Sequence, residues 1–441
     1  MIHYEKALAS TPDISEIYLR IGADQLLLGK LDKAESSLKK ATEIAPARTK
    51  AYVLLAVVYT ARGQFDMAEA MHEEALKHDP EDMKILTFLS DILVLQQKLD
   101  KAAEVYERIL RLRGNDAFLY FNLGLIYSKL NILDKAEANL EKAVEMDKGY
   151  TEAQLVLGIL YEVDGKYVQA IEQYKKVQEN DPVNQESYVR LAQLYHRIGQ
   201  TEKAIEEGCK LMVLIPGAPE PYIRNFSIYL SEKEYDKAEK VLRSALEKGI
   251  GDGMILAGLG YVETVRGRYA GAVNYYEAAC KKEPDNERYR FSLATVYDQS
   301  GNKKKAEEIL ADLVSRGTGL PEVYNYLGYM YVEEGKELEE AMRLIKRSLE
   351  MDPENGAYID SLGWAYFRKG ELVKAREELE RAVKYLPDDS TVREHLGDVY
   401  AACGELDKAS VEWKKALDLG PDDEAEKKIK KDLKKIKKGG R

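Results

Sequence analysis

The chain has 441 residues, of which 45% are hydrophobic and 32% charged, with 12 prolines and no low-complexity tract, as is typical of an ordered, helix-rich protein. Its net charge of −11 and the lack of an arginine-rich stripe disfavour nucleic acid as a partner. The apolar runs are far shorter than the ~20 residues that a membrane-spanning helix needs.

Neither metal nor catalytic chemistry is suggested by the motifs. Cys209, Cys280 and Cys403 form no Cys-x-x-Cys pair, and the five histidines add no zinc spacing. No nucleophile elbow, phosphate loop or dinucleotide fingerprint occurs. We therefore expect no enzyme activity, cofactor or metal, and we expect His72 and Cys280 to be packing residues.

Residues 1–14 resemble the end of a second helix whose first helix is missing, because Tyr4, Ala7 and Pro12 match the repeat described below. We expect the natural protein to extend further at this end, where an export signal or lipid anchor would lie. As written, the start lacks the features of a signal peptide, which favours a cytoplasmic location.

From residue 15 onwards the chain repeats itself with a period of 34 residues. A small residue, such as Gly124 or Gly363, is followed three residues later by an aromatic residue and twelve residues later by alanine. The alanines are Ala34, Ala68, Ala102, Ala136, Ala170, Ala204, Ala238, Ala272 and Ala306, then, after one step of 35, Ala341, Ala375 and Ala409.

Each unit is predicted to be two antiparallel helices. A glycine such as Gly63 or Gly165 lies between two segments of helical periodicity, where a left-handed cap is needed. Prolines such as Pro80 and Pro182 follow the second helix and end it. The small residues and the alanines allow the two helices of a pair to approach closely.

The segment LYFNLGLIYSKLNILDKAEANLEKAVEMD resembles a tetratricopeptide repeat, and the pattern covers twelve units from 15 to 423. The resemblance implies an all-α, right-handed superhelix in which the first helix of each pair lines the concave side. We expect six units over 15–218 and six over 219–423. The junction near 216–226 is irregular because Phe226 replaces a small residue and Lys233 replaces a glycine, and bending is expected there.

A second stripe on the first helices marks the expected binding groove. With the small residue counted as position 8, positions 2, 5, 9 and 12 lie roughly 130° from the core stripe, at about 100° per residue. An apolar track outside the core usually marks an interaction surface. The alternative is that these side chains pack against the next unit. Its apolar members include Leu19, Leu26, Val53 and Val57, and those that we expect to contact a partner are Phe121, Leu125, Leu155, Ile159, Tyr261, Phe291, Tyr329, Trp364 and Phe367.

Polar side chains surround Trp364 in this prediction. They are expected to orient a partner's backbone or charged group, although a solvated surface charge is the ordinary role of any one of them. These residues are Asp360, Arg368, Glu394, His395 and Asp398. The lysine and asparagine with which related co-chaperone domains hold a terminal carboxylate are absent from positions 5 and 9.

The last three units carry a closer resemblance. They share Asp-Ser-Leu-Gly-Trp at 360–364, His-Leu-Gly-Asp at 395–398 and one extra residue after Gly335 with a group of bacterial tetratricopeptide proteins. Many of that group are outer-membrane lipoproteins facing the periplasm, and some are adaptors of carboxy-terminal processing proteases. The resemblance implies an envelope location, which competes with the cytoplasmic expectation.

Residues 424–441 carry nine Lys or Arg against three acids, a charge of +6, and Ala425, Ile429, Leu433 and Ile436 recur at helical spacing. A solenoid needs a terminal cap with a polar outer face, and capping is the expected role. The alternative is a basic tail that docks on an acidic partner or an anionic membrane.

The sequence as a whole predicts a non-enzymatic scaffold that holds a partner protein in its groove, with an envelope enzyme such as a processing protease as one such partner. The alternatives are a membrane-associated assembly factor docking through the basic tail and a cytoplasmic regulator.

Overall fold

A computed structural model describes residues 13–114 and 116–439. The described residues form helices α2 to α26 and no strand, which confirms the all-α prediction. None of these helices combines the length and the apolar character needed to cross a bilayer. The remnant helix expected at Tyr4, Ala7 and Pro12 lies outside the described residues.

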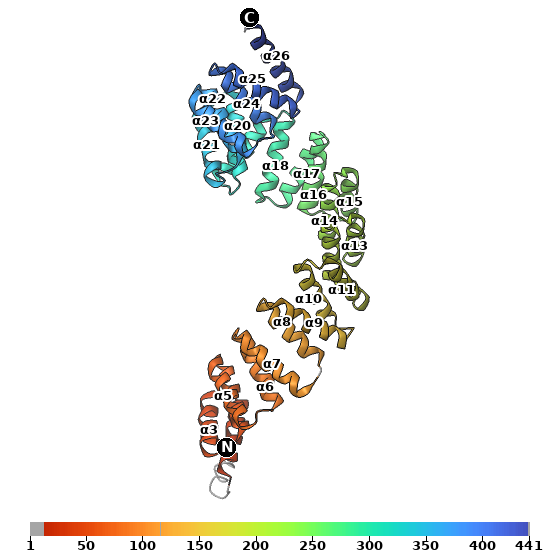
Figure 1. Ribbon diagram of the computed structural model, residues 1–441, viewed down its shortest axis with the longest axis vertical. Helices are drawn as coiled ribbons and strands as arrows, with labels where there is room; N and C mark the ends of the chain where they lie inside the picture. The colour runs from red at the N-terminus through yellow and green to blue at the C-terminus, as the bar shows by residue number, and fades with distance from the viewer. Residues whose placement is uncertain (1–12, 115, 440–441) are drawn as a thin grey trace. The chain divides into compact units, whose positions relative to one another are not determined.

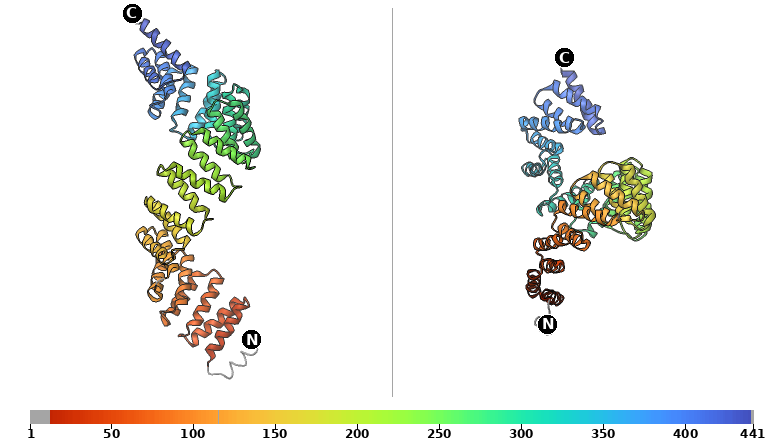
Figure 2. Two further views of the ribbon diagram at one scale, coloured as in Figure 1. Left: turned by 90° about the vertical axis from the view of Figure 1, so that its right-hand side faces the viewer. Right: turned by 60° about the horizontal axis from the view of Figure 1, so that its bottom comes forward.

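The chain divides between Pro216 and Gly217 into two compact units, and each unit is an α-solenoid of consecutive helix pairs (Figures 1 and 2). The helices of the N-terminal unit are α2 Ile14–Leu27, α3 Leu31–Ile44, α4 Thr49–Ala61, α5 Phe65–His78, α6 Met83–Leu95, α7 Leu99–Arg113, α8 Ala117–Lys129, α9 Leu133–Met146, α10 Thr151–Val163, α11 Tyr167–Asn180, α12 Gln185–Arg197 and α13 Thr201–Leu214.

The C-terminal unit contains six further pairs and a last helix. Its helices are α14 Glu220–Ser231, α15 Tyr235–Glu247, α16 Gly253–Val265, α17 Tyr269–Lys282, α18 Glu287–Gln299, α19 Lys303–Ser315, α20 Pro321–Glu334, α21 Leu338–Met351, α22 Gly356–Lys369, α23 Leu372–Tyr385, α24 Ser390–Ala402, α25 Leu406–Asp418 and α26 Asp423–Gly439.

The turn between the two helices of a pair has a left-handed residue at a fixed position. Gly63 has φ +71° there, and an L side chain is strained in this region. Three equivalent positions nevertheless carry a side chain: Gln97 and Asn131 have φ 59°, and Lys233 has φ 58°. The backbone therefore keeps one turn geometry whether or not glycine is present.

Close approach within a pair explains the recurring small residues. A Cβ added at Gly397 would lie 2.4 Å from Cδ1 of Trp413, and one added at Gly158 would lie 2.6 Å from Cε1 of Tyr174. The glycines thus make room for large rings on the second helix, because neighbouring side chains in a packed interior leave no spare volume.

The irregular pair α14–α15 compensates for its missing small residue. Phe226 is half-buried, and its ring would lie 3.3 Å from a Cβ placed at Gly258 of α16. A glycine in the following helix therefore accepts the ring that the pair itself cannot bury. Bending at this junction stays a prediction.

Consecutive units are tied by a recurring tyrosine. The hydroxyl of Tyr161 in α10 donates to Glu141 in the preceding second helix over 2.6 Å, and that of Tyr400 donates to Glu380 over 2.9 Å. Tyr297 donates to Glu277 in the same way, while the Nζ of Lys305 lies 4.7 Å from the Tyr297 ring centroid. The aromatic position of the repeat thus serves contacts between units as well as packing within them.

Helix α26 covers the end of the array. Ile429 is buried, and Leu433 and Ile436 pack against the same hydrophobic cluster. Lys428 donates to Glu394 and Asp398 of α24, each over 2.6 Å. These contacts support the capping role, and docking of the tail on a membrane stays a prediction.

Candidate functional site

First helices of successive pairs contact one another directly. Such contacts join α2 to α4, α14 to α16, α20 to α22, and α22 to α24. The helices joined in this way share a surface, and Trp364 of the expected stripe lies on it, in contact with α20 and α24.

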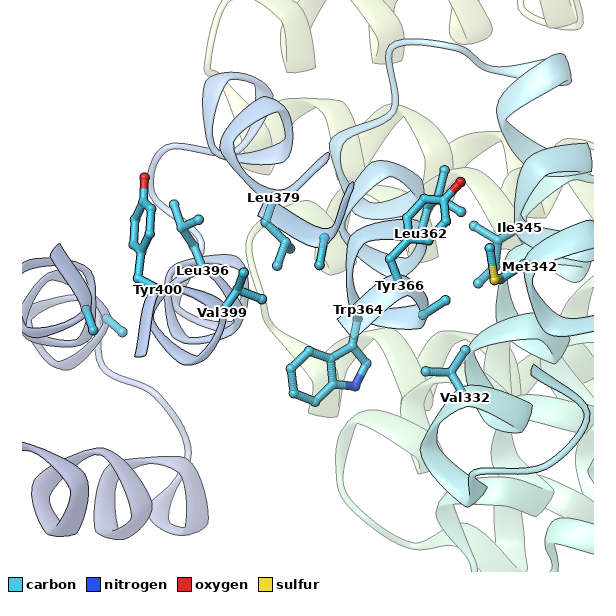
Figure 3. Packing of buried hydrophobic residues seen from close by; sticks show 14 of the residues in the cluster. Val332, Met342, Ile345, Leu362, Trp364, Tyr366, Leu379, Leu396, Val399 and Tyr400 are labelled. Carbon is cyan, nitrogen blue, oxygen red and sulfur yellow. The ribbon is translucent and has the colours of Figure 1, made fainter. Parts of the chain in front are cut away.

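Trp364 of α22 lies between two other first helices in this surface, and its indole appears among the buried residues in Figure 3. It is 9% exposed, its Nε1 donates to Glu333 of α20 over 2.7 Å, and its ring stacks on His395 of α24 with centroids 4.0 Å apart. The ring of Phe367 also stacks on the indole of Trp364, with centroids 4.9 Å apart.

His395 is held by a buried carboxylate. Its Nδ1 lies 3.0 Å from both oxygens of Asp360, which is also buried. Burial alone would lower the pKa of His395, but the charge and hydrogen bond of Asp360, aided by Glu394 and Asp398, raise it above its ordinary value. The Asp360–His395 pair therefore favours a protonated imidazole that stacks on the indole of Trp364, which is a cation–π arrangement.

The expectation of an exposed aromatic track is wrong at Trp364, where the alternative of packing against the next unit holds. The physical reason is that two residues from the neighbouring units contact the indole: His395 stacks on its ring, and Glu333 accepts the hydrogen bond of its Nε1. A solvated surface role is likewise wrong for Asp360, Glu394 and His395, which are buried, whereas Arg368 is exposed.

Tyr329 and Phe367 are half-buried against the same cluster, and Asp398 is bound to Lys428 and to Nε1 of Trp413. Phe291 meets Tyr326 edge to face at 5.8 Å, and Tyr261 is 43% exposed. A partner-binding role for these residues stays a prediction.

The N-terminal part of the stripe is more open. Phe121, Leu125, Leu155 and Ile159 are all half-buried. Leu125 lines a cleft of about 420 Å³, which we call the α6–α8 cleft, whereas Phe121 packs against Tyr150 at 5.0 Å. The residues lining the cleft are Thr87, Ser90, Asp91, Val94, Leu95, Leu99, Tyr106, Ile109, Phe118, Leu119, Asn122, Leu125, Ile126 and Lys129.

Large apolar side chains are exposed in and beside this cleft. Phe118 of α8 and Leu95 of α6 are each 62% exposed, whereas Phe88, which is 46% exposed, does not line the cleft and stacks on His72 of α5. Partial burial raises the pKa of Asp91, which also lines the cleft. A hollow with apolar walls and one carboxyl can hold an apolar side chain beside a hydrogen-bond donor.

Sequence reasoning did not name Phe88, Asp91, Leu95 or Phe118. Phe118 and Asp91 occupy positions 2 and 9 of their units, so the same counting could have found them. Phe88 and Leu95 fall beside the stripe, at positions 6 and 13, and only the three-dimensional structure shows that they are exposed.

The described residues contain no cluster of His, Cys, Asp or Glu able to hold a metal ion. Cys209 is exposed, and Cys280 is half-buried and packs against a hydrophobic cluster. His72 is 3% exposed, in agreement with the expected packing role, but its Nδ1 has no hydrogen-bond partner among the described atoms.

Family models described as tetratricopeptide repeat match residues 15–48, 53–117, 119–150, 185–207, 266–326 and 361–424, which together are more than half of the chain. The chain belongs to the tetratricopeptide repeat proteins. Proteins of this class bind other proteins, and the array is a protein-interaction scaffold.

Among curated proteins, the chain is similar to Protein O-mannosyl-transferase TMTC1 of Homo sapiens, with 29% identity over 147 residues. The match covers 33% of this chain and 16% of that protein, so the chain spans about a sixth of that relative.

Similar solved structures include the APC/C hetero-tetramer Cut9–Hcn1, with 16% identity, 98% of each chain covered and a TM-score of 0.48. Yeast Tom70 has 16% identity over 97% of this chain and 96% of its own, with a TM-score of 0.43. YrrB, described as a TPR protein with an unusual peptide-binding site, has 23% identity over 45% of this chain and 97% of its own, with a TM-score of 0.36.

Proposed function

We propose that this scaffold holds a segment of a partner protein in the α6–α8 cleft. The observation that carries the proposal is the pair of exposed apolar side chains, Leu95 and Phe118, that line a hollow of about 420 Å³. Exposed apolar groups concentrated in one place mark interaction surfaces more often than scattered ones do.

The chemistry of the cleft suggests what the segment carries. Apolar anchors would fill the space between Phe118 and Leu95, and each large anchor buried in this way typically contributes ~2 kcal/mol or more. The Asp91 carboxyl beside the apolar wall favours a donor or a cation next to the anchor. An amphipathic helix with a basic residue beside its apolar face has this combination.

The test is a pull-down from the source cell's extract, followed by titration of the purified captured protein. We expect Leu95→Ser plus Phe118→Ser to abolish capture, while Val168→Ser, a substitution of an even more exposed apolar residue on α11, leaves it unchanged. Equal capture by all three proteins would reject the cleft as the binding site.

The partner's identity rests on the resemblance of the last three units. Asp-Ser-Leu-Gly-Trp at 360–364 and His-Leu-Gly-Asp at 395–398 support an adaptor for a bacterial envelope enzyme, such as a carboxy-terminal processing protease. We expect such a protease to co-purify with the chain and to lose binding when Leu95 and Phe118, which line the α6–α8 cleft, are replaced by Ser. Capture of cytosolic proteins alone would argue against the envelope role.

A further inference from the structure

A second cleft, of about 520 Å³, lies on the other side of the helix pairs, between the second helices α9 and α11 and over α10. We name it the glutamine cleft, after Gln154 and Gln173. We propose that it binds a guanidinium group carried on an aliphatic stem. It is lined by Glu141, Val144, Glu145, Lys148, Gln154, Leu157, Tyr161, Gln173, Lys176, Glu179 and Asn180.

A change at one position of the repeat accompanies the cleft. The position of Gln154, fourth in its unit, is occupied by Tyr120 in the preceding unit and by Tyr188 in the following one. Gln154 is 1% exposed and is held by the Lys148 carbonyl, to which its Nε2 donates over 2.7 Å, and by Asn180, which donates to its Oε1 over 3.1 Å. An amide fixed in this way leaves the space of a phenol ring empty.

Gln173 faces this space with an unused acceptor. It is 8% exposed, and its Oε1 has no hydrogen-bond donor among the described residues. A buried amide oxygen that lacks a donor loses its hydration without compensation, which typically costs ~1–3 kcal/mol. A ligand with an N–H group aimed at Gln173 would remove that cost.

The remaining hydrogen-bonding groups of the lining are mostly acceptors. Glu141, Glu145 and Glu179 contribute three carboxylates, of which Glu141 already accepts from Tyr161. Lys176 is paired with Glu172 outside the cleft over 2.8 Å, and Lys148 is exposed at the rim. The site therefore calls for a ligand group that donates only.

A guanidinium group meets this demand better than an ammonium. It presents five N–H donors in a planar fork and has no acceptor, so it can reach a buried amide oxygen and a carboxylate together. Leu157, Val144 and the Tyr161 ring supply apolar surface for the stem. The inference rests on these contacts and is independent of the α6–α8 cleft.

Free arginine-like compounds and arginine side chains of a protein segment share this chemistry, and calorimetric titration of the full chain separates them. The probes are free arginine, N-acetyl-arginine amide and a capped peptide with one central arginine, each compared with its citrulline counterpart, which keeps the shape but loses the charge. We expect the arginine form of at least one pair to bind and its citrulline form to bind at least about tenfold more weakly.

Two variants test the site itself. Gln154→Tyr fills the cleft with the residue that neighbouring units already carry, and Gln173→Leu removes the acceptor, so we expect both to fold with an unchanged or raised urea midpoint and to lose binding at least about tenfold. Gln169→Tyr, on an exposed position of α11 outside the cleft, is the matched control. Binding of citrulline equal to that of arginine, undiminished binding by Gln154→Tyr, or no binding of any arginine probe would overturn the proposal.

Discussion

His72 is a buried side chain whose protonation opposes folding. Desolvation lowers its pKa from 6.5 to about 4, because no acidic partner compensates for burial between α5 and the Phe88 ring. Equivalent positions in other units carry leucine, as at Leu38 and Leu140. Imidazole at this site is therefore compatible with folding only while it is neutral.

We predict that acid destabilises the α4–α7 region through this residue. Since the folded pKa lies below the unfolded one, stability is full above pH 6.5 and is lost as pH falls towards 4, by up to about 3 kcal/mol. Urea unfolding followed by circular dichroism at pH 7 and pH 5 should show this loss in the wild type, and His72→Leu should reduce it. An identical pH dependence in the variant would contradict the assignment.

His395 affects the pH dependence of stability in the opposite direction to His72. Desolvation lowers its pKa, but Asp360, Glu394 and Asp398 together raise it above its ordinary value, so its contribution to stability is full below the unfolded pKa and is lost as pH rises through the folded value. The two tryptophans of the chain, Trp364 and Trp413, both belong to this region and report on it alone.

We therefore predict that the urea midpoint followed by tryptophan fluorescence falls as pH rises from 6.5 towards the alkaline range, and that His395→Gln flattens this dependence. Glu394 and Asp398 also raise this pKa and are held by Lys428, so the control is His72→Leu, which lies outside this region and leaves all of these groups in place. A wild-type midpoint that does not fall with rising pH would contradict the raised pKa.

The left-handed turns offer a test at single residues. Gln97 has φ 59° where other units have glycine, and a non-glycine residue there is strained by roughly 1–2 kcal/mol. Replacement by glycine removes this strain, but the more flexible glycine loses more backbone entropy on folding, which offsets part of the gain. We expect Gln97→Gly to stabilise by about 1 kcal/mol and Gly63→Ala to destabilise by a similar amount. Midpoints that move in the reverse order would show that local contacts, and not φ, decide these turns.

At the scale of elements, the tie between Tyr297 of α18 and Glu277 of α17 links one unit to the next. A double-mutant cycle of Tyr297→Phe and Glu277→Gln should give a coupling of about 1 kcal/mol, as expected for a partly buried hydrogen bond. Lys305→Met, which removes the cation over the ring, tests whether that contact adds to the coupling. A coupling near zero would mean that apolar packing alone holds the units together.

The helix pairs could be predicted from sequence because each is a local pattern. The glycine turn near Gly63 and the alanine positions lie within a few tens of residues of their partners, so periodicity and turn chemistry suffice. The state of Trp364 could not be predicted, since its exposure depends on His395 and Glu333 in two other units. Helical spacing shows that a side chain points away from the partner helix of its own pair. It does not show whether a neighbouring unit buries that side chain.

The need to know how neighbouring helices pack applies to one of the two clefts and not to the other. The α6–α8 cleft depends on how α6 and α8 pack around Tyr106 and Ile109, which no single helix reveals. The glutamine cleft, in contrast, has a sequence signal, because Gln154 interrupts a tyrosine position of the repeat.

For the whole molecule, an array whose repeats contact mainly their neighbours offers many surfaces of similar composition. What distinguishes one part of such a scaffold is local: an unfilled cleft with exposed apolar side chains, as at Phe118, or a cleft with an unpaired buried acceptor, as at Gln173. Function in this chain is accordingly expected to reside in a few units and not along its full length.

The most direct measurement is site-specific photo-crosslinking in the source cell, with a benzophenone amino acid placed at position 118 or, as the control, at position 168. Both side chains are well exposed, but only position 118 lies in the α6–α8 cleft. The account predicts a discrete crosslinked partner from position 118 that is absent from position 168. Equal products from both positions, or none from position 118, would contradict the claim that this cleft holds a partner protein.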